Sequence, residues 1–300
     1  MCREGKNQAA NIRIRGHSMP INPKPASHTI EVNDINIHYL ESGDANDEVA
    51  LMLHGWPTSA HLWRNILPIV GEKKRAIAID LPGYGLSDKP PDTRYSFIYY
   101  EKILEGFMEE MGITKIDLVV HDLGGPVGIF WALRHPEKVR SLVLLNTLVY
   151  PEMSWAVKVF GLAIRLPLIR NWMASPAGMR FSLKFGVYNK QNITQEVMKG
   201  YQDPFQTKEA RTGLLKGGQG LSMKGFHEIA EKLSQYKGPI QLIYGENDRI
   251  LPDVAQTMQR VKDELPQAKI IPIPNCGHFL QEDDPEAIAV MLNTFYTNNE

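Results

Sequence analysis

The sequence predicts an α/β fold: a mostly parallel sheet with helices on both faces and an inserted helical cap. Short segments rich in Val, Ile and Leu alternate with longer amphipathic segments, and the short ones are apolar throughout rather than at every second residue. Such strands are typical of a parallel sheet that is buried on both faces. The alternation stops at Tyr150 and resumes near Pro239, which predicts that the intervening residues form a separate helical layer.

These breaks divide the chain into four parts. We expect residues 1–27 to be a flexible extension, because they carry several basic residues but no apolar segment typical of a secretory signal. Residues 28–149 are then the first part of the core, residues 150–236 the helical cap, and residues 237–300 the second part of the core.

The first part of the core begins with a hairpin. β-forming residues on both sides of Asn33 and Asp34 predict two antiparallel strands, over 28–32 and 35–40. The elements expected next, in order, are strand 49–53, helix 60–70, strand 75–79, helix 96–111, strand 116–120, helix 127–134 and strand 141–145.

The rest of the chain begins with the cap. Between Tyr150 and Tyr236 we expect helices only, with many large apolar side chains. The core resumes with strands 239–244 and 269–273, and the elements expected after each strand are helices 253–265 and 285–296.

Composition and charge exclude several classes of partner. With 43% hydrophobic residues, the 300-residue chain can bury a large core. The 33 basic and 34 acidic residues give a net charge of −1 without long blocks of one sign, which predicts neither a nucleic-acid nor a membrane partner. We therefore expect the ligand to be a small apolar molecule. We expect the protein to be a monomer or a weak homodimer. The two cysteines, Cys2 and Cys276, cannot form a disulfide framework, so we expect a reducing compartment, the cytoplasm.

The stretch LVVHDLGGPVG (residues 118–128) predicts a sharp turn from a buried strand into a helix. Turns of this kind, often G-x-S-x-G, hold a nucleophile above a sheet. Here Asp122 takes the central position, Gly124 follows it, and Val120 replaces the first glycine. Alternatively, Asp122 is only a helix N-cap, so the assignment depends on whether the chain supplies its partners.

Two later strands end in loops that supply such partners. Asp248 follows the strand at 239–244, and His278 follows the strand at 269–273. The carboxyl ends of parallel strands meet at one edge of a sheet, where chemistry gathers. The order nucleophile, acid, histidine is that of α/β-hydrolases. No metal-ligand spacing such as H-E-x-x-H or C-x-x-C occurs, so we expect neither a metal nor a cofactor.

Four motifs extend this pattern: HGWPTSAHLWRN (54–65), DLPGYGLSD (80–88), His121-Asp122 and Gly277-His278. Together they resemble the branch of the α/β-hydrolase superfamily that holds haloalkane dehalogenases and epoxide hydrolases. The resemblance covers nearly the whole chain from residue 28, and YQDPFQT (201–207) is similar to the cap of the dehalogenases. It implies that Asp122 is the nucleophile, His278 the base and Asp248 its acid. Some dehalogenases place the acid where this chain has Asn146.

An aspartate nucleophile narrows the reaction. Its carboxylate is ionised at pH 7 and can attack a saturated carbon directly, which would form an ester on Asp122. His278 would then activate the water that hydrolyses the ester. We expect the backbone N–H groups of Trp56 and Leu123 to stabilise the oxyanion.

The leaving group is less well defined by the sequence. Dehalogenases commonly bind the halide with a Trp directly after the nucleophile, but this chain has Leu123 there, so the indoles of Trp56 and Trp172 are the candidate donors. The side chains expected to line a substrate pocket are His54, Trp172, Tyr188, Tyr201, Phe205 and Phe279.

Three functions therefore stay open. The preferred one is hydrolysis of a carbon–halogen bond, because the cap and residues 57–65 match the dehalogenases more fully. An epoxide hydrolase is the close alternative, and Tyr150, Tyr188 and Tyr201 are available to protonate the alkoxide. A third is a ligand-binding homologue with little turnover.

Overall fold

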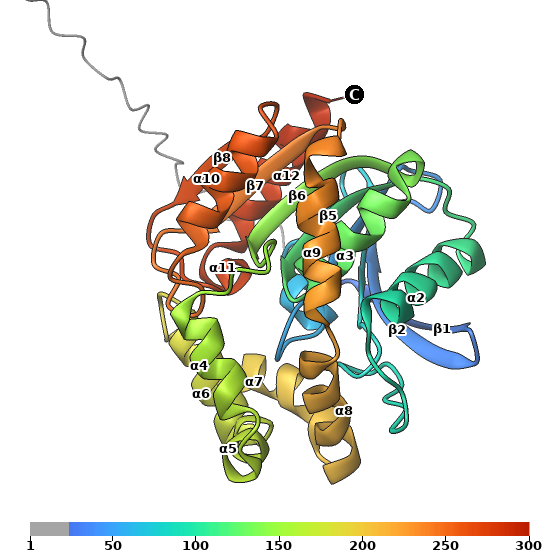
Figure 1. Ribbon diagram of the computed structural model, residues 1–300. Helices are drawn as coiled ribbons and strands as arrows, with labels where there is room; N and C mark the ends of the chain where they lie inside the picture. The colour runs from blue at the N-terminus through green and yellow to red at the C-terminus, as the bar shows by residue number, and fades with distance from the viewer. Residues whose placement is uncertain (1–23, 300) are drawn as a thin grey trace, which may run out of the picture.

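The computed structural model describes residues 24–299 and is built on one eight-stranded sheet, with strand order β1-β2-β4-β3-β5-β6-β7-β8 (Figure 1). β2 runs antiparallel to both of its neighbours, β1 and β4. β3 to β8 are parallel to one another. The strands are β1 (Ala26–Val32), β2 (Ile35–Ser42), β3 (Val49–Leu53), β4 (Arg75–Ile79), β5 (Ile116–Asp122), β6 (Val139–Thr147), β7 (Ile240–Gly245) and β8 (Lys269–Ile273). This confirms the predicted fold class.

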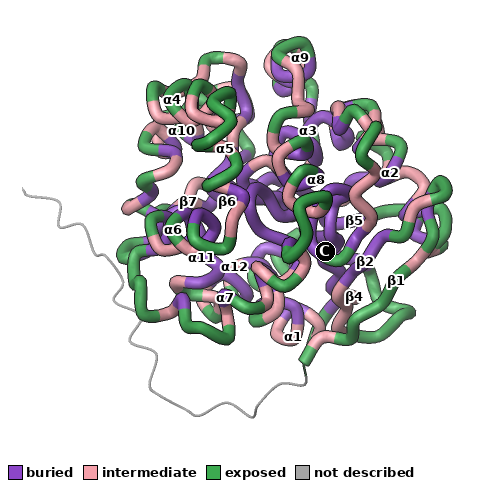
Figure 2. Tube along the Cα trace, turned by 90° about the horizontal axis from the view of Figure 1, so that it is seen from below, coloured by how far each residue is buried: buried purple, intermediate pink, exposed green. Residues whose placement is uncertain are grey.

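Helices cover both faces of the sheet. On one face α1 packs against α12, and on the other α2 packs against α3 (Figure 1). These core helices are α1 (Leu67–Val70), α2 (Phe97–Glu110), α3 (Gly124–Arg134), α10 (Val254–Glu264), α11 (Leu280–Asp283) and α12 (Pro285–Thr297). The strands between the two layers are fully buried along β3 and β5, as the interior of Figure 2 shows.

The segment between β6 and β7 is helical throughout, without a strand. Its helices are α4 (Trp155–Ala163), α5 (Pro167–Met173), α6 (Pro176–Gly186), α7 (Gln195–Gln202), α8 (Lys208–Gln219) and α9 (Met223–Lys232). They begin beyond the carboxyl end of β6, and α4 to α8 form a layer apart from the sheet (Figure 1). α9 packs against α3 and so leads the chain back to the core. No helix of residues 24–299 is long and apolar enough to cross a membrane.

Most elements lie where the sequence predicted, and one does not. The helix expected over 60–70 is a 3-10 turn, Ala60–Trp63, followed by the short α1. Pro68 in the first turn of α1 explains the break, because proline lacks an N–H and fits only at a helix start. β1 also begins at Ala26, inside the expected extension, whose residues 1–23 lie outside the described residues.

Candidate active site

The turn between β5 and α3 holds Asp122 in the left-handed conformation, with φ at 49°. Small residues make this turn possible. A Cβ on Gly124 would lie 2.3 Å from the His54 carbonyl oxygen, and one on Gly125 would lie 1.5 Å from Thr147 Oγ1. The strand and helix backbones therefore approach closely, and Asp122 stands at the carboxyl edge of the sheet.

The Asp122 carboxylate is buried between a backbone hydrogen-bond donor and the His278 ring. Its Oδ1 accepts the backbone N–H of Trp56 at 2.7 Å, and its Oδ2 lies 3.4 Å from His278 Nε2. Burial alone would raise the pKa of Asp122, but the His278 side chain and the Leu123 backbone N–H lower it below its usual value. Asp122 is therefore an ionised carboxylate in the free protein.

His278 lies between two carboxylates. Its Nδ1–H donates to Asp248 Oδ2 at 2.8 Å, while Nε2 faces Asp122. Burial opposes the charged form, but Asp248 and Asp122 together raise the pKa of His278 to about 10. The structure thus brings together the three residues that the sequence predicted, with His278 as an imidazolium in the free protein.

Asp248 is held in place by three further donors. Its Oδ1 accepts the backbone N–H groups of Ile250 and Leu251, both at 2.8 Å. Its Oδ2 accepts Nδ2 of Asn146 at 2.7 Å. These hydrogen bonds fix the Asp248 carboxylate so that its Oδ2 points at His278 and accepts the Nδ1–H.

Asn146 and His121 contact the three residues, and neither is predicted to do so from the sequence. Asn146 at the end of β6 is fully buried and also bonds the Gly277 carbonyl and the Gly245 N–H, at 3.1 and 2.9 Å. His121 Nε2 lies 2.9 Å from the His278 carbonyl oxygen, which can only accept, so the ring donates. Burial and the nearby His278 lower the pKa of His121 to about 3, so the ring is neutral. Both are positioning residues.

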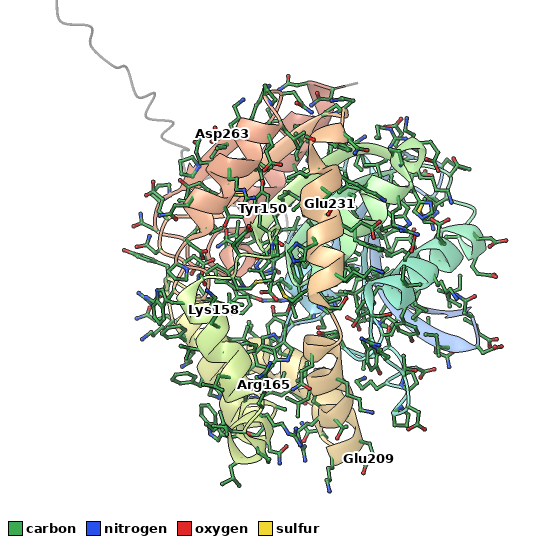
Figure 3. All side chains as sticks on the ribbon, in the orientation of Figure 1. Tyr150, Lys158, Arg165, Glu209, Glu231 and Asp263 are labelled. Atoms are coloured by element: carbon green, nitrogen blue, oxygen red, sulfur yellow. The ribbon has the colours of Figure 1, made fainter. Side chains whose placement is uncertain are left out.

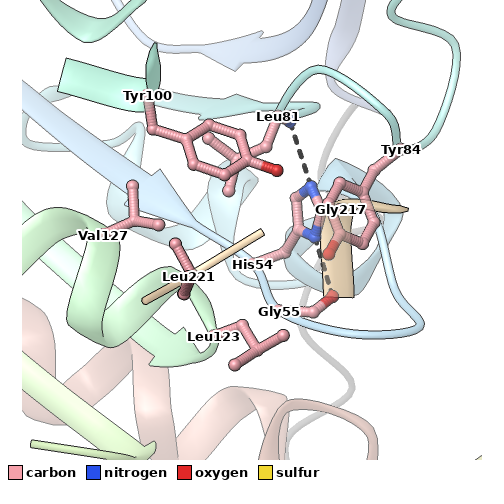
Figure 4. Close-up of a pocket in the computed structure, with 9 residues that line it drawn as sticks. All are labelled: His54, Gly55, Leu81, Tyr84, Tyr100, Leu123, Val127, Gly217 and Leu221. Atoms are coloured by element: carbon pink, nitrogen blue, oxygen red, sulfur yellow. Dashed lines mark hydrogen bonds between the residues drawn. The ribbon is translucent and has the colours of Figure 1, made fainter. Parts of the chain in front are cut away.

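A small cavity lies between the loops after β3 and β4 and the start of α3 (Figure 4). Its volume of about 10 Å³ leaves room for roughly one water molecule. Gly55, which packs directly on the Asp122 carboxylate, and Leu123 form part of its wall. The lining residues are His54, Gly55, Leu81, Tyr84, Tyr100, Leu123, Val127, Gly217 and Leu221.

Two tyrosines of the core, Tyr84 and Tyr100, line this cavity and were missed from the sequence. The Tyr84 ring packs edge-on against His54 at 5.0 Å, and a Cβ on Gly217 of α8 would lie 2.9 Å from the Tyr84 hydroxyl. The phenol therefore faces the junction of core and cap. Burial, and then the charge of Asp122, raise the pKa of Tyr84, so the hydroxyl keeps its proton. The sequence feature that could have identified Tyr84 is its position in the glycine-rich loop at 80–88.

His54 and Trp56, both predicted for the site, lie at its edge. His54 Nε2 accepts the Leu81 N–H at 3.1 Å and Nδ1 donates to the Gly55 carbonyl at 3.0 Å, so the ring is neutral and fixes two loops. The Trp56 indole lies between Phe160 of α4, at 5.1 Å, and Gly218 of α8. Its N–H makes no hydrogen bond within residues 24–299.

Of the six side chains predicted to line a pocket, only His54 lines this cavity, and the other five are divided between the interior and the surface. Tyr201 is buried and donates to Glu282, which also accepts Arg64 at 2.6 Å, so this cluster joins cap and core. Phe205 is buried beneath Lys89, and Phe279 packs against His278 at 4.9 Å.

Three further candidate side chains, Trp172, Tyr188 and Tyr150, also lie outside the cavity lining. Trp172 on α5 and Tyr188 just after α6 are 46% and 42% exposed. Tyr150 packs against Arg260 of α10, 3.6 Å from guanidinium carbon to ring centroid. Figure 3 shows Tyr150 on the core side of the cap helices. No three His, Cys, Asp or Glu side chains of the described chain cluster as metal ligands would.

Comparison with known proteins identifies the family. A family model described as alpha/beta hydrolase fold matches residues 49–285. The chain belongs to this family. A haloalkane dehalogenase of Bradyrhizobium diazoefficiens is 31% identical to this α/β-hydrolase over 83% of this chain and 87% of that protein.

Two further relatives extend the comparison. A cis-3-alkyl-4-alkyloxetan-2-one decarboxylase of Shewanella oneidensis is 27% identical over 91% of this chain and 89% of its own. The crystal structure of a haloalkane dehalogenase from Bradyrhizobium elkani superposes with a TM-score of 0.79 at 27% identity, covering 91% of this α/β-hydrolase and 98% of that chain. This α/β-hydrolase therefore resembles haloalkane dehalogenases in sequence and fold, and its relatives are named as enzymes.

Proposed function

We propose that this α/β-hydrolase hydrolyses a carbon–halogen bond of a small apolar molecule through an ester on Asp122. The observation that carries the proposal is the environment of the Asp122 carboxylate. It is ionised, one oxygen is held by the Trp56 N–H, and the other faces His278. A carboxylate needs no base to attack, unlike a serine, and it displaces a leaving group from saturated carbon. Water is the second reactant, and no cofactor takes part.

The first step uses the ionised state of Asp122. A carboxylate oxygen attacks the carbon, the carbon–halogen bond breaks, and the halide leaves with the bonding electrons. The Trp56 indole N–H is free to donate to that halide. The product of this step is a neutral alkyl ester on Asp122.

Formation of the ester changes His278. With the Asp122 charge removed, one of the two carboxylates that raise the pKa of His278 is lost, so the imidazolium releases its proton. Neutral His278 then takes a proton from water, which attacks the ester carbonyl carbon. The N–H groups of Trp56 and Leu123 stabilise the oxyanion, and its collapse releases the alcohol and restores the carboxylate.

Ring opening of a strained oxygen heterocycle is the second candidate. The observation that favours it is the Tyr84 phenol, which lines the cavity next to Gly55 and Leu123, whereas the neighbouring Tyr100 hydroxyl donates to the Pro82 carbonyl at 3.3 Å. A leaving alkoxide must gain a proton, which a phenol can supply. An epoxide fits this description. An oxetan-2-one, the substrate type named for two of the relatives, is also a strained oxygen heterocycle, but attack on its saturated ring carbon expels a carboxylate that needs no proton.

A substrate panel separates these functions. Purified protein is incubated with bromoalkanes, terminal epoxides and a cis-dialkyloxetan-2-one, while bromide, diol and carbon dioxide release are measured. The proposal predicts bromide release that is abolished in the Asp122→Asn variant. Turnover of the oxygen heterocycles alone would favour the second candidate, and binding without any turnover would indicate a ligand-binding homologue.

A further inference from the structure

The outer side of the cap carries an unusual number of exposed apolar side chains. On α4 they follow a helical spacing: Trp155, Val159 and Leu162 lie on one face. Leu168 on α5 is 86% exposed. We call the whole set the outer cap surface, and its members are Trp155, Val159, Leu162, Leu166, Leu168, Ile169, Trp172, Phe181, Phe185 and Tyr188.

These residues lie together on consecutive helices. α5 packs against α6, and Trp172 contacts Phe181, with 5.5 Å between ring centroids. Phe181 in turn stacks on Phe185 at 6.0 Å. Figure 2 shows exposed and intermediate residues along α4 and α5 on the face seen from below. Apolar surfaces of this extent mark a site of interaction.

The charge on this part of the chain is strongly one-sided. Residues 153–190 contain six basic residues and no acidic residue, although the whole chain has a net charge of −1. None of the six side chains forms an ion pair with any residue in 24–299. They are Lys158, Arg165, Arg170, Arg180, Lys184 and Lys190. Figure 3 shows Lys158 and Arg165 along the cap.

The combination of apolar and basic side chains indicates what binds the outer cap surface. Exposed Trp, Leu and Phe on a helix with adjacent Lys and Arg are typical of a helix that lies in a membrane interface. A second protein copy would bring the same six positive charges against themselves, which opposes a symmetric dimer on this face. Anionic headgroups instead complement them.

We propose that the outer cap surface docks this protein on a bilayer containing anionic phospholipid. Trp155, Leu162 and Leu168 insert among the headgroups, and the basic side chains contact lipid phosphates. The prediction from whole-chain composition was no membrane partner, because the 34 acidic residues elsewhere mask this local excess in the net charge.

Docking here would place the bilayer next to the active site. α4 presents its outer stripe to solvent, whereas Phe160 on its inner side packs against Trp56, which holds Asp122. One short helix therefore separates the docking surface from the site. An apolar substrate dissolved in the bilayer would reach the protein at this end, but the docking proposal holds whatever substrate Asp122 attacks.

Vesicle co-sedimentation tests the proposal. The full-length protein is mixed with phosphatidylcholine vesicles with and without phosphatidylglycerol, at low and high salt. We expect binding to the anionic vesicles that weakens with salt. Lys158→Gln with Arg165→Gln should weaken it by about 25-fold, at about fivefold per charge.

A matched pair of leucines provides the control. Leu162 and Leu86 are 63% and 62% exposed, and Leu86 lies outside the cap. Leu162→Asn should reduce binding about tenfold, whereas Leu86→Asn should not, and both should keep the melting temperature of the parent. Absence of binding to anionic vesicles, or equal loss in both variants, would overturn the proposal. A dimer that Leu162→Asn dissociates, without vesicle binding, would also overturn it.

Discussion

Asn146 offers the sharpest test of how the triad is held. Its amide makes three buried hydrogen bonds, to the Asp248 carboxylate, the Gly277 carbonyl and the Gly245 N–H. Asn146→Ala leaves all three groups without this partner, and each unpaired buried group costs about 1–3 kcal/mol. Because relaxation recovers part of the loss, we expect the free energy of unfolding to fall by about 3–5 kcal/mol.

The same change should act on one catalytic step. Without the amide, Asp248 orients His278 less well, so hydrolysis of the ester should slow by about tenfold to hundredfold. Formation of the ester does not need His278, so a rapid burst of bromide should precede slow turnover. Urea unfolding and rapid-quench bromide measurements test the two effects. Asn293→Ala, which removes a single side-chain hydrogen bond, to Ile69, is the control. Unchanged stability, or a slowed burst, would refute the role of Asn146.

Four further predictions follow from the site. Gly125→Ala should destabilise the protein by about 2 kcal/mol or more in urea, because the new Cβ would lie 1.5 Å from Thr147 Oγ1. Trp56→Phe should reduce the rate of bromide release about tenfold, since the indole N–H is lost while the backbone N–H stays. Tyr84→Phe should slow epoxide opening in a diol assay and leave bromide release nearly unchanged. The pKa of His278 rises from 6.5 to about 10 on folding, so its stabilisation is complete below pH 6.5 and is lost as the pH rises through 10. Unfolding free energies from pH 6 to 10 should therefore fall more steeply in the parent than in His278→Phe.

Each of these has a contrary outcome. Parent-like stability of Gly125→Ala would contradict the close approach of the two backbones. Unchanged bromide release in Trp56→Phe would exclude its indole as the halide donor. If Tyr84→Phe slowed epoxide opening and bromide release equally, the Tyr84 hydroxyl would not be the proton donor for the alkoxide. Parallel pH profiles of the parent and His278→Phe would contradict the raised pKa.

Local sequence signals predicted the framework well. Asn33 and Asp34 tolerate positive φ, and they adopt 50° and 62° in the turn of the predicted hairpin. Continuous apolar strands predicted the parallel sheet, and polar residues at three strand ends predicted the triad. These features depend on neighbours in the chain or on the rule that parallel strands end at one edge.

Features that depend on contacts between distant segments could not be predicted. The role of Asn146 needs the loops after β7 and β8 to meet it, and Tyr84 faces Gly217 from another part of the chain. In the cap, both faces of α5 and α6 carry large apolar side chains, so periodicity did not show that Trp172 and Tyr188 face outward.

A trapping experiment tests the central claim, the ester on Asp122, most directly. His278→Phe removes the base but keeps the nucleophile and the Trp56 N–H, so incubation with 1-bromobutane should add one butyl group to the protein. Intact mass spectrometry should detect the increase, peptide mapping should place it on Asp122, and Asp122→Asn combined with His278→Phe should show none. If the parent releases bromide but His278→Phe stays unmodified, the covalent mechanism is contradicted.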